Sequence, residues 1–196
     1  APLVRGKGIV TANESGSDQF SFNWLNAILS ALRTKKHRGV LTGSELTDVK
    51  ITLIAGKGHL KHTEGGDFRQ AASRAVRQAL MKTSSILLEP YVRFELTVPS
   101  ESLSKALFDL ESKKAQFEIQ DSGDSRSIIV GRGCIRLLAH YQNEVNAYSK
   151  GQGRFSFQPD GYDVCQDTDE IVAQIGYDPE MDMRNPSSSV FCANGS

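Results

Sequence analysis

The stretch that decides the fold of this chain runs from Gly39 to Glu111. It comprises GVLTGSELTDVKITL (residues 39–53), the loop GKGHLKHTEGGDF (56–68), an alanine-rich segment and SSILLEPYVRFELTVPSESL (84–103). Alternating apolar residues in the first and last of these pieces predict strands, and apolar residues at helical spacing in the alanine-rich piece predict a helix. The stretch therefore predicts an α/β fold in which a loop lies between a strand and a helix.

The elements on either side of this loop have definable limits. Residues 48–54 alternate apolar and polar side chains, so the strand has one buried face. The helix after the loop is predicted to begin near Asp67, as its N-cap. Apolar residues at steps of three and four between Phe22 and Lys35 predict another helix upstream. The cations after that helix either complement its dipole or contact RNA, and the sequence leaves both interpretations open.

The segment after Pro90 predicts a second domain. Strands are predicted at 91–98, 116–120, 127–130 and 154–158, helices around 103–110 and 138–148, and a hairpin turn at 121–124. The order β-α-β-β-α-β is that of the ferredoxin-like split motif. A short helix at 168–175 and an irregular tail follow. The predicted organisation is a first domain over 1–88, a second over 89–165 and a C-terminal extension over 166–196.

Charge is distributed unevenly along the chain, although the formal net charge is zero. Residues 1–88 hold 13 Lys and Arg against 6 Asp and Glu, residues 89–165 hold 9 against 11, and residues 166–196 hold 1 against 6. A basic first domain favours a polyanionic partner, because neutralising phosphates dominates nucleic-acid affinity. A solvated basic face without a partner accounts for the charge equally well.

Global features exclude several classes of protein. The chain has 196 residues, 39% of them apolar, which is enough for one or two ordinary cores. No apolar run approaches the roughly 18 residues of a membrane helix, so we expect a soluble protein without a membrane partner. We also expect it to be cytoplasmic and monomeric. Cys134, Cys165 and Cys192 are odd in number and widely spaced, which favours reduced thiols. The chain begins at Ala1 without a methionine, and we expect it to be a piece of a longer protein.

Motifs for nucleotide, metal or covalent chemistry are weak. Pairs of glycines at residues 6 and 8, 131 and 133, and 151 and 153 lack the frame of a phosphate-binding loop, so no cofactor is expected in this chain. His59 and His62 stand three apart near two carboxylates, but this spacing does not define a zinc site. Cys134 has His140 nearby without the surroundings of an activated nucleophile. We therefore expect no metal site, no catalytic residue and no enzymatic activity of this chain by itself.

An RNA-recognition motif shares the β-α-β-β-α-β order and is an alternative for the second domain. Such motifs stack bases on aromatic residues of the two central strands. The predicted strand 127–130 has no aromatic residue, and Phe94 stands alone on the strand 91–98. Base binding is therefore disfavoured for the second domain, whereas the basic first domain stays a candidate for RNA binding.

Several ordered motifs together resemble the C-terminal half of elongation factor G. They are the stretch 39–53, the Leu87-Leu88-Glu89-Pro90 junction, the strand and helix up to Leu110, and EVNAYSKGQGRF (144–155). Lys113-Lys114-Ala115 stands where elongation factor G usually has Arg-Arg-Gly, and residues 166–196 extend beyond the last strand. Both differences, with the Ser-Val-Phe-Cys stretch at 189–192, are similar to the tetracycline ribosomal-protection branch of that family.

This resemblance implies a fold and a set of contact residues. The fold is a fragment of a ribosomal protein S5 domain 2-like domain, lacking its N-terminal part, followed by a ferredoxin-like domain. The tip that reaches the decoding region of the ribosome corresponds to Gly58, His59, Leu60, Lys61, His62 and Thr63. A second tip loop corresponds to Pro2, Leu3 and Arg5, and the hinge between the domains to Leu88, Glu89 and Pro90.

The tip differs from that of many protection proteins, because it lacks their tyrosine pair and Ser-Pro wedge. The resemblance then implies that Lys61 and a histidine meet phosphates, while His59 or Leu60 stacks on a base.

The resemblance also implies the activity of the parent protein. This is a ribosome-dependent GTPase, with GTP and Mg²⁺ in a domain upstream of Ala1. Its partner is the tetracycline-bound 70S ribosome, with its 16S and 23S RNA, and this chain is the part that dislodges the drug. A housekeeping translocation or recycling factor of the same architecture is an alternative, and so is an RNA-binding module without a GTPase.

Overall fold

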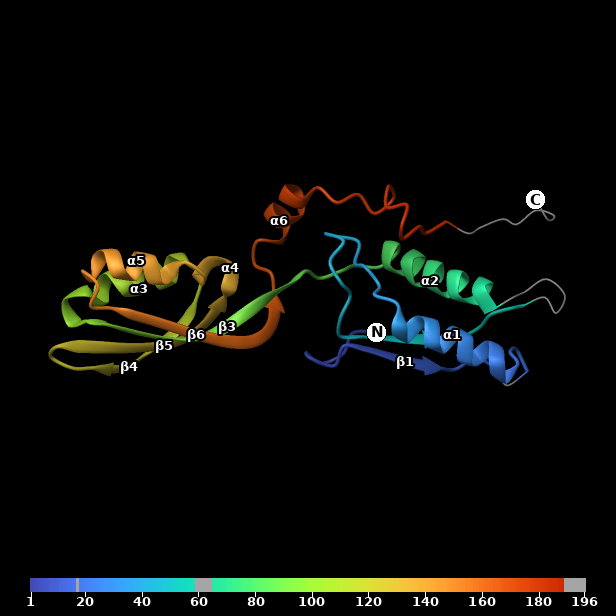
Figure 1. Cartoon of the computed structure of the whole chain (residues 1–196), viewed down its shortest axis with the longest axis horizontal. Helices are drawn as coiled ribbons and strands as arrows, with labels where there is room; N and C mark the ends of the chain where they lie inside the picture. Colours follow the sequence, from blue (N-terminus) through green and yellow to red (C-terminus); the bar gives the residue numbers. More distant parts are fainter. Residues whose placement is uncertain (17, 59–64, 189–196) are drawn as a thin grey trace. The chain divides into compact units, whose positions relative to one another are not determined.

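The computed structural model describes residues 1–16, 18–58 and 65–188. It divides into two compact units: unit 1 contains Ala1–Leu87 and Gln166–Ser196, and unit 2 contains Leu88–Cys165. The chain therefore begins in unit 1, builds the whole of unit 2 and then returns to unit 1 (Figure 1).

Unit 1 is built on a two-stranded parallel sheet. β1 (Ile9–Asn13) pairs with β2 (Val49–Leu53), with Ile9 opposite Val49 and Asn13 opposite Leu53. α1 (Phe22–Thr34) lies in the crossover between these strands, and α2 (Gly65–Met81) follows β2. Parallel strands need a long crossover because the end of one strand and the start of the next lie at opposite ends of the sheet.

The core of unit 1 lies between the two helices and the sheet. Ile28, Leu32 and Phe68 are buried at its centre. Partly buried side chains complete it: Phe20, Trp24, Ile51, Leu53, Ala72 and Val76. The Ser21 hydroxyl caps α1, because its Oγ accepts a hydrogen bond of 3.3 Å from the Trp24 backbone N–H. The cap fixes the start of the helix that presents Trp24 to this core.

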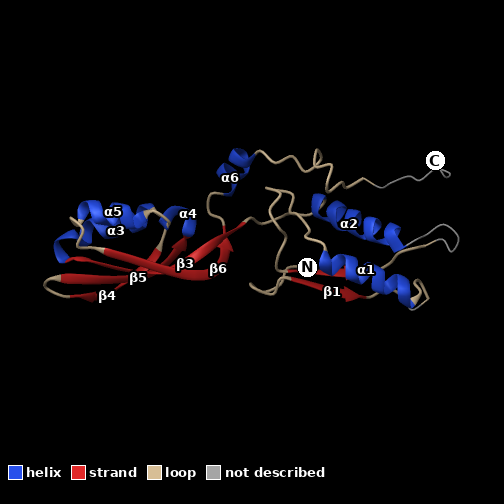
Figure 2. Ribbon diagram, viewed as in Figure 1, coloured by secondary structure: helices blue, strands red, loops and turns tan. Residues whose placement is uncertain are grey.

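Unit 2 is a four-stranded antiparallel sheet with the strand order β4-β5-β3-β6. The strands are β3 (Leu88–Pro99), β4 (Gln116–Ser122), β5 (Arg126–Cys134) and β6 (Arg154–Val164). α3 (Leu103–Ser112) and α5 (Tyr141–Tyr148) cover one face of the sheet (Figure 2), and the short α4 (Ile135–Leu138) precedes α5. The mixed α/β fold with a ferredoxin-like second part, predicted from the sequence, is confirmed.

The core of unit 2 lies between this sheet and its helices. Every second residue of β3 from Val92 to Val98 is buried in it, and Leu96 and Val98 are fully buried. Buried residues of the neighbouring elements complete it: Ala106, Leu110, Ile129, Leu138, Tyr141, Val145 and Phe155. Each large side chain of this kind stabilises the fold by about 1.5–3 kcal/mol.

Three local details differ from the sequence prediction. β1 is absent from the prediction, because its five residues become a strand only by pairing with β2. α2 begins at Gly65, so Asp67 lies in the first helical turn, where its charge still complements the helix dipole, rather than at the N-cap. The helix predicted around 138–148 is divided into α4 and α5.

The C-terminal extension begins with a helix. α6 (Thr168–Ile175) has the limits predicted from the sequence, and it ends at Gly176, whose φ of 59° lies in the left-handed region. Across the described ranges, no helix has the length and apolar character needed to cross a membrane.

Candidate functional site

The candidate site lies at the end of the β1–β2 sheet where both strands finish. Asn13 and Leu53 are the last residues of their strands and lie opposite each other. The connection 14–21 and the loop after β2 therefore leave the sheet at the same end (Figure 1). Of the predicted tip residues, Gly58 is placed at this end. His59, Leu60, Lys61, His62 and Thr63 lie outside the described residues.

Three aromatic rings form a platform beneath the start of the loop. The Phe68 ring lies 5.0 Å from the Trp24 ring and 6.3 Å from the Phe20 ring, measured between centroids. Such pairs add about 0.5–1.5 kcal/mol beyond their burial. Trp24 belongs to α1, Phe68 to α2, and Phe20 to the connection before α1. The platform therefore joins both helices below the loop.

Gly56 and Gly58 lie directly on this platform. A Cβ atom at Gly56 would overlap the Phe20 ring, and one at Gly58 would come within 2.9 Å of Cζ3 of Trp24. Both positions thus require glycine for steric reasons, since real Cβ atoms do not approach neighbours so closely. The Gly56 backbone N–H also donates a hydrogen bond of 3.3 Å to Oε1 of Gln19. The first part of the loop is held to the platform by packing and by this bond.

The exposed side chains at this end carry positive charge and apolar surface. Lys57 is exposed, and Ile54 has an exposed fraction of 70%. Cations that meet phosphates, beside an apolar side chain that meets a base or sugar, form a suitable surface for RNA.

Sequence reasoning missed the platform, because Phe68 lies more than forty residues after Phe20 and Trp24 in the chain. The available signal was the Gly-Lys-Gly at 56–58, which lies between a strand and a helix without a phosphate-loop frame.

The second tip loop predicted at Pro2, Leu3 and Arg5 precedes β1 and lies beside the start of β2. Pro2 forms an isolated antiparallel bridge with Val49, and the Leu3 N–H donates a hydrogen bond of 2.7 Å to the Asp48 carbonyl oxygen. Asp48 and Val49 are at the start of β2, whereas the tip loop follows its end. Because β1 and β2 are parallel, residues before β1 lie opposite to the tip.

Asp48 gives this N-terminal segment a structural role. Its carboxylate accepts hydrogen bonds from the backbone N–H groups of Gly8 at 2.8 Å and Gly6 at 3.1 Å. The bond from Gly8 is the main cause that lowers the pKa of Asp48 below its ordinary value, and the bond from Gly6 adds to it. Asp48 has a φ of 55°, a conformation that aspartate adopts more readily than most residues. Residues 1–8 therefore brace the start of β2.

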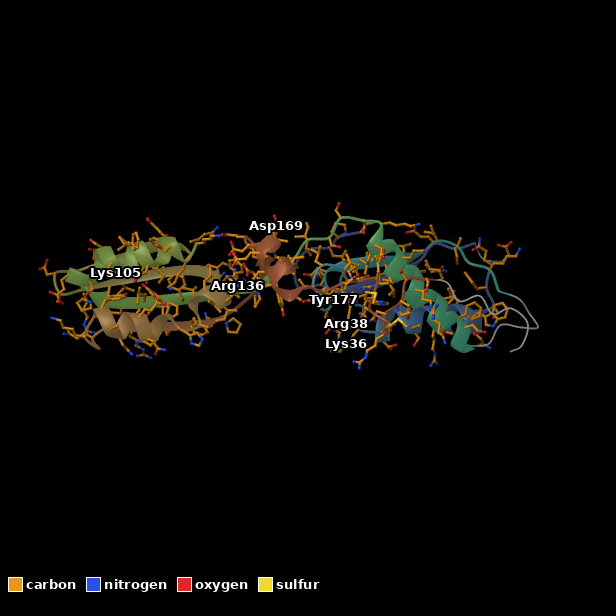
Figure 3. The ribbon with its side chains drawn as sticks, turned by 90° about the horizontal axis from the view of Figure 1, so that it is seen from above. Lys36, Arg38, Lys105, Arg136, Asp169 and Tyr177 are labelled. Carbon is orange, nitrogen blue, oxygen red and sulfur yellow. The ribbon has the colours of Figure 1, made fainter. Side chains whose placement is uncertain are left out.

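The predicted hinge residues are part of a strand. Leu88, Glu89 and Pro90 open β3, and they pair with Val164, Asp163 and Tyr162 of β6. Glu89 is buried, and its Oε2 accepts a hydrogen bond of 3.3 Å from Nε of Arg136, which is labelled in Figure 3. Residues held in a sheet cannot rotate freely. The change from unit 1 to unit 2 falls between Leu87 and Leu88, directly before the first predicted hinge residue.

The other chemistries considered from the sequence find little support in the geometry. Among the described residues, no group of three His, Cys, Asp or Glu side chains is placed to hold a metal ion. Cys134 is buried, and burial, with a hydrogen bond to Glu89, raises its pKa to about 11. A thiol with this pKa is protonated at neutral pH and is therefore a poor nucleophile.

The aromatic residue considered for base stacking in unit 2, Phe94, is not accessible to a base. Phe94 is only 4% exposed and belongs to the core beneath the helices. The Tyr91 ring is covered by the guanidinium of Arg132, 4.4 Å from the ring centroid, and that guanidinium also pairs with Asp160 and Asp163. Both rings are therefore occupied by contacts within unit 2.

Comparison with known proteins relates each part of the chain to a family. The family described as "Elongation factor G, domain IV" matches residues 1–84, and the one described as "Elongation factor G C-terminus" matches residues 86–171. The chain is 30% identical over 179 residues to the tetracycline resistance protein TetP of Clostridium perfringens. This match covers 91% of this chain and 27% of TetP. A crystal structure of a protein from Thermus thermophilus has the same fold, with a TM-score of 0.75 and 18% identity, over 89% of this chain and 26% of that one. The chain spans about a quarter of the length of these relatives.

Proposed function

The chain belongs to the elongation factor G family, as a domain IV joined to the family's C-terminal domain, and we propose that it is the ribosome-contacting part of a translation factor. In this proposal the loop that starts at Gly58 contacts RNA in the decoding region of the small subunit, and unit 2 orients unit 1 on the ribosome. The observation that carries the proposal is the packing of the first residues of this loop against the aromatic rings. Gly56 and Gly58 rest on the aromatic platform, so the loop is presented from rigid elements.

We further propose that the full-length protein protects the ribosome from tetracycline. The identity to TetP, a tetracycline resistance protein, supports this finer proposal. The drug would be dislodged by the tip, with Lys57 and Lys61 meeting phosphates and the neighbouring histidines meeting bases. GTP and Mg²⁺ would be bound by a domain outside these 196 residues, and the protein would act on tetracycline-bound ribosomes in the cytoplasm.

Release of labelled tetracycline from bacterial 70S ribosomes tests this proposal. The full-length protein with GTP should release the drug. A variant that lacks residues 58–65, and one that combines Lys61→Glu with His59→Ala and His62→Ala, should not.

Lys82→Glu is the matched control. It reverses one charge just after α2 ends, away from the tip, and should leave release unchanged. Drug release that persists in both tip variants would exclude the tip as the working element.

A housekeeping translocation or recycling factor is the second candidate. The absence of the Ser-Pro wedge from the loop GHLKHT favours it. A protein of this kind would support polypeptide elongation or ribosome splitting and leave bound tetracycline in place. Ribosome-stimulated GTP hydrolysis without drug release would therefore select this candidate.

A further inference from the structure

The C-terminal extension does not merely follow unit 2, because its second half packs on unit 1 as a segment that we call the strap (residues 176–188). Gln166–Ser196 groups with Ala1–Leu87 as one compact unit. The Tyr177 ring lies against Gly43, where an added Cβ would be 2.9 Å from the ring. The Arg74 guanidinium donates a hydrogen bond of 2.7 Å to the Ser188 carbonyl oxygen. The strap is thus attached to unit 1 at both ends.

Arg77 of α2 is the central attachment of the strap. Its Nη2 donates to the Tyr177 hydroxyl at 2.6 Å and to the Pro179 carbonyl oxygen at 3.0 Å, while its Nη1 donates to the Arg38 carbonyl oxygen at 3.0 Å. Figure 3 shows Arg38 and Tyr177 on the same unit, where Arg77 bridges them. Arg77 is only 4% exposed, and its Nε has no hydrogen-bond partner among the described residues.

Contacts within the strap fix its own shape. The Tyr177 hydroxyl donates a hydrogen bond of 2.6 Å to Oδ2 of Asp182, and Nδ2 of Asn185 donates one of 2.9 Å to the same oxygen. These hydrogen bonds lower the pKa of Asp182 to about 2, and the bond from Tyr177 has the largest effect. Residues 183–186 are therefore held in a definite position beside α2.

Between the strap and α2 lies a cavity of about 420 Å³, which we call the strap pocket. Its walls are the end of α1, the loop after it, one face of α2 and residues 183–186. Six cationic side chains line it: Lys35, Arg38, Arg69, Arg74, Arg77 and Arg184. The volume is within the range of about 300–1,000 Å³ that is common for small-ligand sites.

The positive charge of the strap pocket is not neutralised by the described part of the chain. None of its six cations forms a salt bridge with a described carboxylate, and no carboxylate is among the lining residues. Within the described ranges, Arg38, Arg74 and Arg77 donate only to carbonyl and hydroxyl oxygens, which carry no formal charge. Six like charges around one cavity repel each other, and a bound anion would relieve this repulsion.

We propose that the strap pocket binds a phosphate group, either of a small phosphate ester or of an RNA backbone. Guanidinium groups bind phosphate through paired N–H donors, and every cation of the pocket except Lys35 is an arginine. Arg69 and Arg184 are exposed and have no side-chain hydrogen bond among the described residues, so they are available to a ligand. The strap supplies Arg184, so this site exists only while the strap is attached. The inference does not rest on the proposed function, because it concerns the 196-residue chain without a ribosome.

Calorimetric titration of the 196-residue chain with inorganic pyrophosphate tests this proposal. Binding of one pyrophosphate per chain is expected at low salt. The double variant Arg69→Gln/Arg184→Gln should weaken it by about ten-fold for each arginine removed. The double variant Lys36→Gln/Lys82→Gln is the matched control, because it removes two exposed charges outside the pocket and should change the affinity by less than about two-fold. Thermal unfolding of each variant verifies that the fold is intact.

A second titration with a short single-stranded RNA distinguishes the source of the phosphate. Pyrophosphate binding that depends on Arg69 and Arg184 indicates a small phosphate ester. RNA binding that depends on them, without pyrophosphate binding, indicates a nucleic-acid backbone. The proposal is overturned if neither ligand binds, or if the pocket variant and the control variant weaken binding equally.

Discussion

The guanidinium of Arg77 donates a hydrogen bond of 2.6 Å to the hydroxyl of Tyr177, a residue 100 positions later in the chain. The whole of unit 2 lies between these two residues in the sequence. The Arg77 side chain is buried, so its N–H group cannot form a hydrogen bond with water when the Tyr177 hydroxyl is removed. Loss of this acceptor should therefore weaken the attachment of the entire strap to unit 1.

Replacing Tyr177 with Phe should loosen the strap. The change removes the acceptor of Arg77 and the donor to Asp182, and a buried charged donor without its partner costs about 1–3 kcal/mol. Trypsin should then cleave after Arg184 about ten-fold faster or more, because local opening exposes the strap. Tyr162→Phe is the control, since Tyr162 is 52% exposed. Equal cleavage rates in both variants would contradict the role of Tyr177.

Replacing Gly58 with Ala should disturb the aromatic platform. The new methyl group would lie 2.9 Å from the Trp24 ring and 3.1 Å from the Phe68 ring, and overpacking of this kind costs about 1–3 kcal/mol. Trp24 is the single tryptophan of the chain, so its fluorescence reports the change directly. Gly66→Ala is the control, because a Cβ there meets nothing within 4 Å. An unchanged emission spectrum and stability for Gly58→Ala would show that the loop is not seated as described.

The stability of unit 1 should fall as the pH drops below about 6.5, because of His37. This side chain is 3% exposed, and burial, with the nearby Lys35, lowers its pKa below the ordinary value of 6.5. Between the lowered pKa and 6.5, the unfolded chain binds a proton that the folded chain does not, so stability rises with pH in this window. The pKa of Asp48 is also lowered, but this carboxyl changes the stability only at pH values below its ordinary pKa of 3.8.

Urea unfolding at about pH 7.5 and pH 5.5, followed by Trp24 fluorescence, measures this dependence. His37→Gln keeps a donor for the Leu32 carbonyl oxygen, which His37 Nε2 contacts at 3.1 Å, but it cannot titrate. The stability lost between the two pH values should therefore be smaller in the variant. A loss of the same size would assign the effect to another group.

Cys134 should resist thiol reagents while the protein is folded. With a pKa of about 11, only about one thiol in a thousand is ionised at pH 8, and the side chain is 3% exposed. Cys165 is also buried. In a Cys192→Ser variant, reaction with a chromogenic disulfide should be slow until a denaturant is added. Fast stoichiometric labelling without denaturant would contradict the burial of both thiols.

The sequence predicted those parts of the fold that depend on local pattern. The alternation from Val92 to Val98 and the helical spacing from Leu103 to Leu110 are local, and both elements occur in the structure. α6 needs only its own residues to be recognised. These elements could be predicted because each of their signals is contained within about ten residues.

The rest depends on contacts between distant residues. β1 becomes a strand through pairing with β2, forty residues further along by the register Ile9 to Val49. The platform brings Phe20 and Trp24 onto Phe68, and the strap brings Tyr177 onto Arg77. The sequence pattern of each segment does not indicate which distant segment it contacts. The end of the sheet at which Pro2, Leu3 and Arg5 lie is a further example, since only the direction of both strands shows which loops share an end.

The return of the chain to unit 1 also has a consequence for biosynthesis. Leu88 and Val164, at the entry and exit of unit 2, are paired neighbours in its sheet, so unit 2 is inserted in unit 1 through two adjacent points. A ribosome making this protein delivers unit 2 before it delivers Tyr177 and Arg184. Unit 2 can fold as soon as it emerges, whereas unit 1 must wait for its last piece. The strap pocket is therefore assembled only after the whole of unit 2 has been synthesised.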